Sequence, residues 1–143
     1  RAKEAARRLR TPSPLSIILM DVDHFKKIND RFGHDVGDKV LRRLADTLKD
    51  TVRCNDVIAR WGGEEFMVMA ADTDLQEALK LAERLRREVA RLRVPPLEQI
   101  TISLGLAEAG PGEDLGQLIV RADRALYRAK SEGRNQAVLA EPF

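Results

Sequence analysis

The chain has 143 residues, enough for one domain with a hydrophobic core, and its 43% apolar and 34% charged residues are typical of a globular protein. The formal net charge of +2 excludes a protein that holds nucleic acid through a broadly basic surface, because such a surface needs a large excess of Lys and Arg. The single cysteine, Cys54, excludes a disulfide framework and a cysteine zinc site, and it fits a reducing compartment.

The start of the chain predicts a helix end followed by a buried strand. Residues 1–10 are Ala-rich and charged, as in a helix, and prolines then stop the pattern. We therefore expect a piece of a longer protein, with residues 1–14 as the end of a helix and a linker, and residues 15–143 as the domain. Residues 15–20 are continuously apolar, which is typical of a strand buried on both faces.

The next segment predicts helical structure interrupted by a loop. Residues 24–29 suit a short helix, and residues 30–37 carry two glycines and two aspartates, which favour a loop. Residues 38–52 place apolar side chains at helical spacing and predict an amphipathic helix. Residues 53–56 are polar and predict a turn.

Residues 57–71 predict a β-hairpin with Gly62 and Gly63 at its tip. We expect strands at residues 57–61 and 65–71. Glycine readily takes positive φ, so the pair suits a two-residue hairpin turn, and the missing Cβ atoms would let a ligand approach the backbone. Glu64 and Glu65 then place two carboxylates where the returning strand begins.

The rest of the chain alternates helices and strands. Asp74 and Glu77 match a capping box at the start of an amphipathic helix, which two prolines end at residues 95 and 96. A strand, a helix and a last strand are expected at residues 99–107, 115–130 and 136–140. This order predicts an α+β domain with a ferredoxin-like βαββαβ core, in which helices cover one face of a largely antiparallel sheet.

Three or four carboxylates are expected near one another, because the first strand of a βαββαβ sheet lies beside the hairpin. The candidates are Asp21, Asp23, Glu64 and Glu65. Carboxylates this close need a cation or raised pKa values. Oxygen ligands without His or Cys favour magnesium, which commonly shares its coordination with substrate phosphates. The alternative interpretation is that these acids are solvated side chains at strand ends and bind nothing.

Further polar residues suit a purine nucleoside triphosphate. Three basic side chains could neutralise its phosphates: Lys26, Lys130 and Arg134. The last two could equally be cations that favour the C-terminus of a helix. An Asn or Asp side chain can hydrogen-bond a purine edge, and candidates flank the predicted loop: Asn29, His34 and Asp38. The alternative for these residues is ordinary turn and cap chemistry.

Three blocks of sequence resemble the signature blocks of GGDEF domains, the diguanylate cyclases of bacterial signalling. They are D-V-D-H-F-K-K-I-N-D-R-F-G-H-D-V-G-D at 21–38, R-W-G-G-E-E-F at 60–66, and A-D-R-A-L-Y-R-A-K-S-E-G-R-N at 122–135. The likeness runs in the same order from about residue 15 to the end. It implies a sheet like that of nucleotidyl cyclases and polymerase palms.

The resemblance implies that two GTP molecules condense to cyclic di-GMP and two pyrophosphates across an antiparallel homodimer, one GTP in each subunit. It implies Mg²⁺, or Mn²⁺ in its place, held by Asp21, the carbonyl of Val22, and Glu64. Either Glu64 or Glu65 would help to deprotonate the attacking 3′-hydroxyl. The acidic pair after the two glycines is Glu-Glu here rather than Asp-Glu, because Glu64 stands where the family name has Asp. This variant also occurs in active members.

The resemblance also implies roles in binding GTP. Asn29, His34 and Asp38 would contact the substrate, with the first and last reading guanine. Gly62 and Gly63 would leave room for it, and Lys26 would stabilise charge in the transition state. The β- and γ-phosphates would be bound by Lys130 and Arg134.

A possible inhibitory site precedes the hairpin. Arg53 and Asp56 form an R-x-x-D pattern with five residues between Asp56 and Gly62. By itself this pattern suits a turn salt bridge of little energy. In the family this placement marks the site where cyclic di-GMP binds and restrains the enzyme, and Arg84 resembles a secondary arginine of that site.

Two other functions were weighed against catalysis. A catalytically inactive GGDEF domain could act as a receptor for cyclic di-GMP or GTP, and the absent D-x-L-T-G-L-x-N-R opening segment bears on activity more than on nucleotide binding. A single-stranded RNA-binding domain needs aromatic residues on its central strands, and these carry Ile, Leu, Val and Met, so no nucleic acid polymer is expected.

The expected setting is the cytoplasm, as a free protein or as the cytoplasmic part of a membrane-anchored sensor. The longest apolar run, at residues 17–20, is too short to span a bilayer, and the N-terminus has no signal-peptide pattern. An N-terminal sensor or regulatory domain is expected in the full-length protein.

Overall fold

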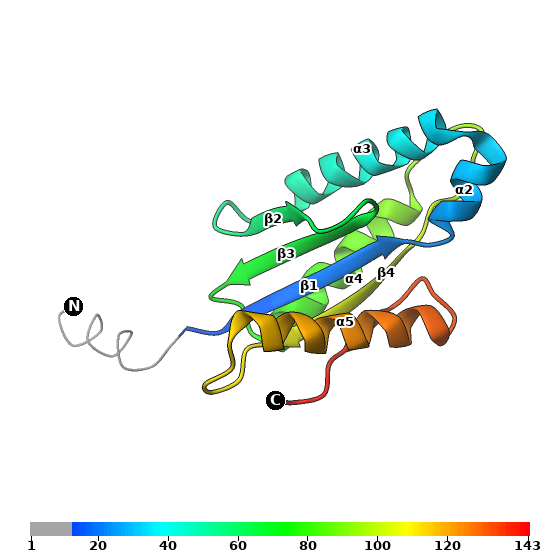
Figure 1. Ribbon diagram of the computed structural model, residues 1–143. Helices are drawn as coiled ribbons and strands as arrows, with labels where there is room; N and C mark the ends of the chain where they lie inside the picture. The colour runs from blue at the N-terminus through cyan, green and yellow to red at the C-terminus, as the bar shows by residue number, and fades with distance from the viewer. Residues whose placement is uncertain (1–12) are drawn as a thin grey trace.

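A five-stranded sheet forms the centre of the molecule in the computed structural model, which describes residues 13–143 (Figure 1). The helix end expected at residues 1–10 lies outside these residues. The elements are β1 (Leu15–Val22), α2 (Phe25–Phe32), α3 (His34–Thr51), β2 (Val57–Arg60), β3 (Glu65–Ala71), α4 (Leu75–Ala90), β4 (Ile102–Glu108), α5 (Leu115–Ser131) and β5 (Ala137–Leu139).

The strand order is β2-β3-β1-β4-β5, with antiparallel pairs throughout except for the parallel pair β4–β5. This arrangement confirms the predicted α+β class. The first strand is central, as its unbroken apolar run requires, and all four residues from Ile17 to Met20 are fully buried. Its antiparallel register with β3 places Asp21 opposite Glu65, so the end of β1 meets the hairpin as expected.

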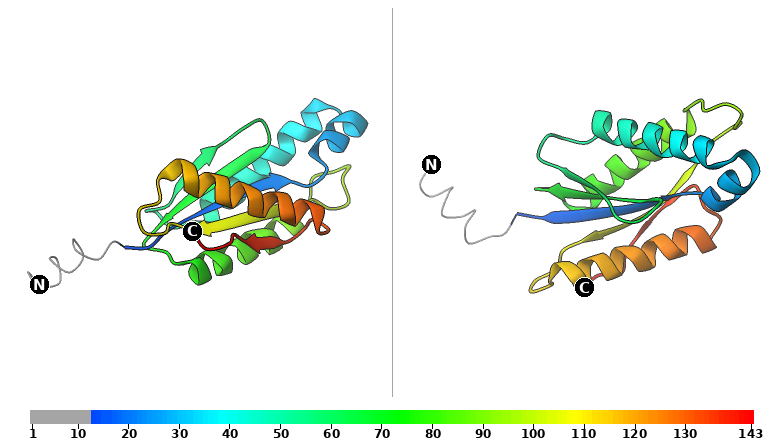
Figure 2. Two further views of the ribbon diagram at one scale, coloured as in Figure 1. Left: turned by 60° about the horizontal axis from the view of Figure 1, so that its bottom comes forward. Right: turned by 45° about the horizontal axis from the view of Figure 1, so that its top comes forward.

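Helices cover both faces of the sheet, and the prediction that they cover one face is wrong. On one face Ile18 and Met20 pack with α3 and α4, while on the other Ile17 and Leu19 pack with α5. Figure 2 shows these two layers on either side of the strands. Because alternate residues of a strand point to opposite faces, an apolar run on a central strand needs cover on both.

Residues 30–37 are helical rather than a loop. The helix α2 continues to Phe32, and α3 begins at His34. Gly33, at φ 90°, separates them in a backbone conformation that favours glycine. Phe32 and Val36 pack partly buried against the core, which explains why both sides of the glycine stay helical. The polar composition of this segment therefore reflected exposed helix faces.

The helix α5 approaches the sheet closely at Gly105 of β4. A Cβ atom at this position would lie 2.2 Å from the Leu126 backbone nitrogen and 2.3 Å from the Ala122 carbonyl oxygen. The small side chains Ala122 and Ala125 on the same helix are fully buried in this contact layer. Glycine is therefore needed at position 105 for the helix to pack at this distance.

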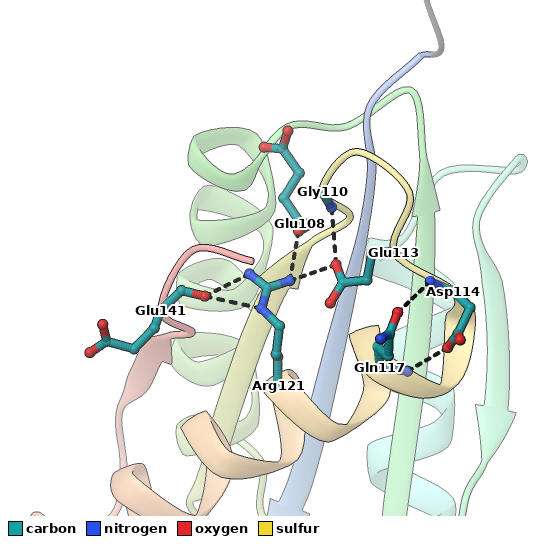
Figure 3. A network of polar contacts seen from close by, with 7 residues as sticks. All are labelled: Glu108, Gly110, Glu113, Asp114, Gln117, Arg121 and Glu141. Atoms are coloured by element: carbon teal, nitrogen blue, oxygen red, sulfur yellow. Dashed lines mark hydrogen bonds and ion pairs between the residues drawn. The ribbon is translucent and has the colours of Figure 1, made fainter.

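An arginine in α5 ties together the segments around the start of that helix (Figure 3). The Arg121 guanidinium pairs with the Glu113 carboxylate at 2.8 Å and donates to the carbonyl oxygens of Glu108 and Glu141. Glu113 is fully buried and also accepts from the Gly110 backbone N–H at 3.0 Å. Asp114 begins α5 with a capping box. The network fixes the N-terminal part of α5.

In residues 13–143, no helix has both the length and the apolar character needed to cross a membrane.

Candidate functional site

Three elements bring charged side chains to one end of the sheet. The carboxyl end of β1, the β2–β3 loop and the carboxyl end of α5 lie together there (Figure 1). Asp21 comes from β1, Glu64 and Glu65 from the hairpin, and Lys130 from α5. The Lys130 ammonium donates to Asp21 Oδ2, and the Asp21 side chain is only 4% exposed.

All three carboxyl groups of the cluster have raised pKa values. Burial is the main cause for each, and it raises the pKa of Asp21 although Lys130 opposes the shift. The pKa of Glu64 is raised by burial and then by the negative charge of Asp21. The pKa of Glu65 is raised by the same two causes, again against Lys130. Raised pKa values are one of the two outcomes expected for crowded carboxylates.

The donor set fits a small divalent cation with a shared coordination shell. Asp21 Oδ1 is buried and has no hydrogen-bond partner among residues 13–143, so this oxygen is available as a ligand. Within residues 13–143 no three His, Cys, Asp or Glu side chains are arranged to enclose a metal. Two carboxylates and a carbonyl would leave positions for phosphate oxygens and water, as magnesium sites usually do.

Of the three or four carboxylates expected near one another, Asp23 is the one whose oxygens are taken up by protein donors, although its negative charge still helps to raise the pKa of Asp21. Its carboxylate accepts hydrogen bonds from the Thr101 and Ser103 hydroxyls and from the Asn135 backbone N–H. The strand ends at Val22, so the alternation that would have aligned Asp23 with Asp21 no longer applies.

A pocket of about 370 Å³ between α3 and the hairpin is the candidate base-binding site. Its lining residues are Asp38, Leu41, Arg42, Ala45, Arg60 and Phe66. Asp38 was predicted from the sequence, whereas Arg42 and Arg60 were not. The signal for Arg42 was its position four residues after Asp38, on the same helix face.

Asn29 and His34 flank this region without lining the pocket. Asn29 is partly buried, and its side chain lies against Gly37, where a Cβ atom would meet Asn29 Oδ1 at 1.9 Å. His34 is exposed at the first residue of α3. Asn29 thus lies against the start of α3, and His34 faces solvent.

The other predicted phosphate-binding cations lie outside the acidic cluster. Lys26 is exposed on α2, and Arg134 is exposed in the turn after α5. Among the residues that the structure describes, neither makes a hydrogen bond or ion pair with Asp21, Glu64 or Glu65. Lys130 alone of the three is in contact with the cluster.

The hairpin connection is longer than predicted. The Trp61 N–H donates to the Glu65 carbonyl oxygen at 2.8 Å, which leaves residues 62–64 as a three-residue connection. Neither Gly62 nor Gly63 has positive φ, so the two-residue turn is wrong. The Arg60 side chain donates to the Gly63 carbonyl oxygen and holds the connection. Both glycines still leave open space, since a Cβ at Gly63 would meet no atom within 4 Å.

The candidate inhibitory residues form a turn just before β2, at the end of the hairpin strands away from their connection. The Asp56 carboxylate accepts from the Arg53 backbone N–H at 3.0 Å, while the Arg53 guanidinium donates to the Thr73 hydroxyl. Asp56 Oδ1 is buried without a partner. Arg84 is exposed on α4 and, within the described part of the chain, bonds to neither residue.

A larger pocket of about 1080 Å³ follows the outer face of α5 and contains none of the residues predicted from the sequence. Val120, Tyr127 and Phe143 contribute to its apolar lining.

Comparisons with known proteins identify the family of the chain. The family model described as "Diguanylate cyclase, GGDEF domain" matches residues 1–136. The diguanylate cyclase DgcM of Escherichia coli K12 is 46% identical over 125 residues, which are 87% of this chain and 30% of DgcM. The chain thus spans less than a third of that relative.

Two solved structures are similar throughout. One is the active GGEEF domain of a diguanylate cyclase from Vibrio cholerae, with a TM-score of 0.88 and 38% identity over 99% of this chain and 91% of that one. The other is the GGDEF domain of DgcB from Caulobacter crescentus in complex with c-di-GMP, with a TM-score of 0.85 and 33% identity over 96% and 84%. The chain belongs to the diguanylate cyclase family of GGDEF domains.

Proposed function

We propose that this domain joins two GTP molecules into cyclic di-GMP, releasing two pyrophosphates, with one GTP bound by each copy of a homodimer. The observation that carries the proposal is the meeting of Asp21, Glu64, Glu65 and Lys130 at one end of the sheet. A triphosphate bound with a divalent cation is the partner that such a mixture of acids and cation suits.

Asp21, Glu64 and the Val22 carbonyl would hold Mg²⁺, or Mn²⁺ in its place. When bound, the ion supplies a lower pKa for the attacking hydroxyl and neutralises phosphate charge. Glu65 is suited to take the 3′-hydroxyl proton, because burial and the charge of Asp21 raise its pKa and so make it a stronger base than an ordinary glutamate. The hydroxyl oxygen then bonds to the α-phosphorus of the other GTP, and the bond to pyrophosphate breaks.

The remaining residues bind and orient GTP. The Asp38 carboxylate at the 370 Å³ pocket can accept hydrogen bonds from guanine N1–H and the exocyclic amine. Asn29 and His34 lie beside this pocket, and Gly62 and Gly63 leave space for the nucleotide. Holding the two reactants in line supplies much of the rate enhancement in such transfers. The triphosphate would be neutralised by Lys26, Lys130 and Arg134.

The test is incubation of concentrated protein with GTP and MgCl₂, followed by mass spectrometry. We expect cyclic di-GMP from the unaltered chain, at least a hundredfold less from Asp21→Asn, and no loss from the exposed-helix control Glu88→Gln. The same assay is repeated on a longer chain that keeps its natural N-terminal segment. If that protein is dimeric and binds GTP but forms no cyclic di-GMP, the result contradicts catalysis and supports a receptor.

Product inhibition is a separate part of the proposal. The R-x-x-D turn supports it, because the Arg53 guanidinium and the Asp56 carboxylate offer a donor fork and an acceptor for a guanine or phosphate. Arg84 is the candidate third contact. In the unaltered protein, accumulating cyclic di-GMP should slow the reaction until product formation levels off. We expect Arg53→Ala to leave the initial rate unchanged and to remove this levelling off. Equal inhibition of the variant by added cyclic di-GMP would show that the site lies elsewhere.

The setting of the domain follows from what it needs. GTP is abundant in the cytoplasm, and we propose that the domain works there. Since the chain spans 30% of DgcM, we also propose that it is joined to an N-terminal regulatory or sensor domain in the full-length protein.

A further inference from the structure

Asp23 is a buried carboxylate whose hydrogen bonds join three separate segments. It is 6% exposed. Oδ1 accepts from the Ser103 hydroxyl at 2.6 Å, and Oδ2 accepts from the Thr101 hydroxyl at 2.7 Å and the Asn135 backbone N–H at 2.9 Å. Its own N–H donates to the Thr101 carbonyl oxygen at 2.9 Å. Three donors therefore point at this one side chain. A carboxylate can accept all three bonds, because both of its oxygens are acceptors, whereas an amide or a hydroxyl also carries a donor.

The turn that Asp23 holds has an uncommon backbone. Gly133, Arg134 and Asn135 have φ angles of 122°, 64° and 46° in succession. Positive φ is rare for residues other than glycine, and for arginine it is unusual. Two backbone bonds maintain it, from Arg134 N–H to the Ala129 carbonyl oxygen and from Asn135 N–H to Asp23. The turn is also joined to the sheet at its far end, where the Leu104 N–H of β4 donates to the Gln136 carbonyl oxygen at 2.9 Å, so the bond to Asp23 holds the side of the turn that faces the end of β1.

The same turn is also held from α4. The Arg86 guanidinium donates to Asn135 Oδ1 at 3.2 Å and is itself paired with Glu83 at 2.8 Å. Asn135 is thus fixed through its backbone by Asp23 and through its side chain by Arg86. The neighbouring Arg134 is held through its carbonyl oxygen, which accepts from Gln136 Nε2 at 3.3 Å, so the backbone on both sides of Asn135 is fixed.

The strand end that carries Asp23 also carries Asp21, two residues earlier. Asp21 contacts Lys130 in the last turn of α5, and Asp23 contacts Asn135 in the turn that follows. The two carboxylates together therefore align residues 130–135 against the end of β1. Asp21 faces the candidate site, whereas Asp23 is buried and holds the segment through the Asn135 backbone.

We propose that Asp23 is a positioning residue for the triphosphate: by holding the Gly133–Asn135 turn, it places Arg134 where it contacts the β- and γ-phosphates. This inference rests on the proposed function, because the phosphate contact of Arg134 belongs to it. Asp23 itself touches neither substrate nor metal, since its oxygens are occupied by protein donors.

The test compares the affinity of GTP and GMP by titration calorimetry in MgCl₂. Asp23→Ala should weaken GTP about tenfold, the scale seen when a residue that orients a ligand-binding group is removed, and should leave GMP unchanged. Arg134→Ala should give the same pattern. The double variant should be no weaker than either single variant, because both changes remove one contact.

Asp114→Ala is the matched control for a loss of stability. It removes the capping box at the start of α5 without touching the turn at its other end, so GTP affinity should not change. Asp23→Asn covers the case in which Asp23→Ala fails to fold. Its amide keeps the size and part of the accepting capacity, so it should give a smaller loss of GTP affinity and faster hydrogen exchange at the Asn135 amide.

The positioning role is overturned by any of three results: equal weakening of GTP and GMP, additive losses for Asp23 and Arg134, or an Asn135 amide that stays protected in Asp23→Asn. Failure of the proposed reaction is distinguishable from these results. A chain that binds GTP but forms no cyclic di-GMP contradicts the reaction, while the comparison of GTP with GMP still decides the role of Asp23.

Discussion

At the scale of single residues, the acids of the site destabilise the fold when they are ionised. Asp21, Glu64 and Glu65 have pKa values above their ordinary values of 3.8, 4.5 and 4.5. The folded chain therefore binds protons more tightly than the unfolded chain. Stability attributable to these groups falls as pH rises from about 4 through the raised pKa values. Removing one charge should consequently stabilise the protein at neutral pH.

Glu64→Gln should increase the free energy of unfolding at pH 7 in EDTA by about 0.5 kcal/mol, a modest value because the side chain is partly solvated. The gain should disappear near pH 4, where glutamate becomes protonated in both states. MgCl₂ should stabilise the unaltered protein more than the variant, because only the former keeps both carboxylate ligands. Urea unfolding at both pH values measures each effect.

Glu88→Gln on α4 serves as the control and should change little under all conditions. A Glu64→Gln protein that is less stable than the unaltered chain at pH 7 in EDTA would show that the carboxylate is not under charge repulsion.

Gly37 allows Asn29 to lie against α3. Replacing Gly37 should change GTP binding without lowering the free energy of unfolding. Alanine is favoured over glycine in a helix by about 1 kcal/mol, so Gly37→Ala should not lower the free energy of unfolding. Its Cβ would meet Asn29 Oδ1 at 1.9 Å, so the flexible side chain must turn away. If Asn29 reads guanine, KM for GTP should rise several-fold in a steady-state assay.

The control for this change is Gly116→Ala in the first turn of α5. It gains the same helix propensity and meets only the Asp114 side chain, at 3.3 Å. KM should be unaffected. An unchanged KM in Gly37→Ala as well would remove Asn29 from the set of guanine contacts.

At the scale of elements, the sequence predicted what local patterns determine. The apolar run of β1 and the capping box of Asp74 and Glu77 are both present as expected. What it did not predict depends on partners distant in the chain. No local signal says that α5 covers the second face of the sheet, or that Gly105 exists to admit it.

The same reasoning applies within the site. Asp21 and Glu65 could be paired from the sequence, because strand order and antiparallel direction determine which ends meet. Asp23 could not be placed, because its orientation depends on donors at Thr101, Ser103 and Asn135, which lie 78, 80 and 112 residues further along the chain. Periodicity ceases to be informative where a strand ends.

The packing of α5 gives a prediction at this scale, because Arg121 joins it to the preceding loop and the C-terminal segment (Figure 3). Arg121→Ala leaves the Glu113 carboxylate fully buried without its cation. Breaking a buried pair in this way typically costs about 3 kcal/mol or more. Urea unfolding at pH 7 should show this loss.

The matched control is Arg91→Ala, which breaks an exposed pair with Glu88 at 3.7 Å and should change stability by about 0.5 kcal/mol or less. Adding Glu113→Gln to Arg121→Ala should restore part of the loss by removing the unpaired charge. Equal effects of Arg121→Ala and Arg91→Ala would mean that the network contributes little to holding α5.

At the scale of the whole molecule, the site lies at one open end of the sheet rather than within an enclosed cavity. One copy supplies one set of acids and one pocket between α3 and the hairpin, the proposed base site. Joining two GTP molecules by two reciprocal attacks requires a second set, and a second copy of the chain can supply it by facing the first. The proposed reaction therefore makes the rate dependent on how often two copies meet.

Initial rate per protomer should accordingly rise in proportion to protein concentration while the chain is mostly monomeric, and level off as dimers accumulate. Fusing a parallel dimeric coiled coil before residue 13 should raise the rate of dilute protein strongly, because tethering brings the effective concentration to about the millimolar range. The same fusion carrying Asp21→Asn should remain inactive, which separates assembly from chemistry. Rates are measured as pyrophosphate release, alongside sedimentation to define the oligomeric state. A rate per protomer that stays constant across concentrations at which only monomer sediments would contradict reaction across two copies.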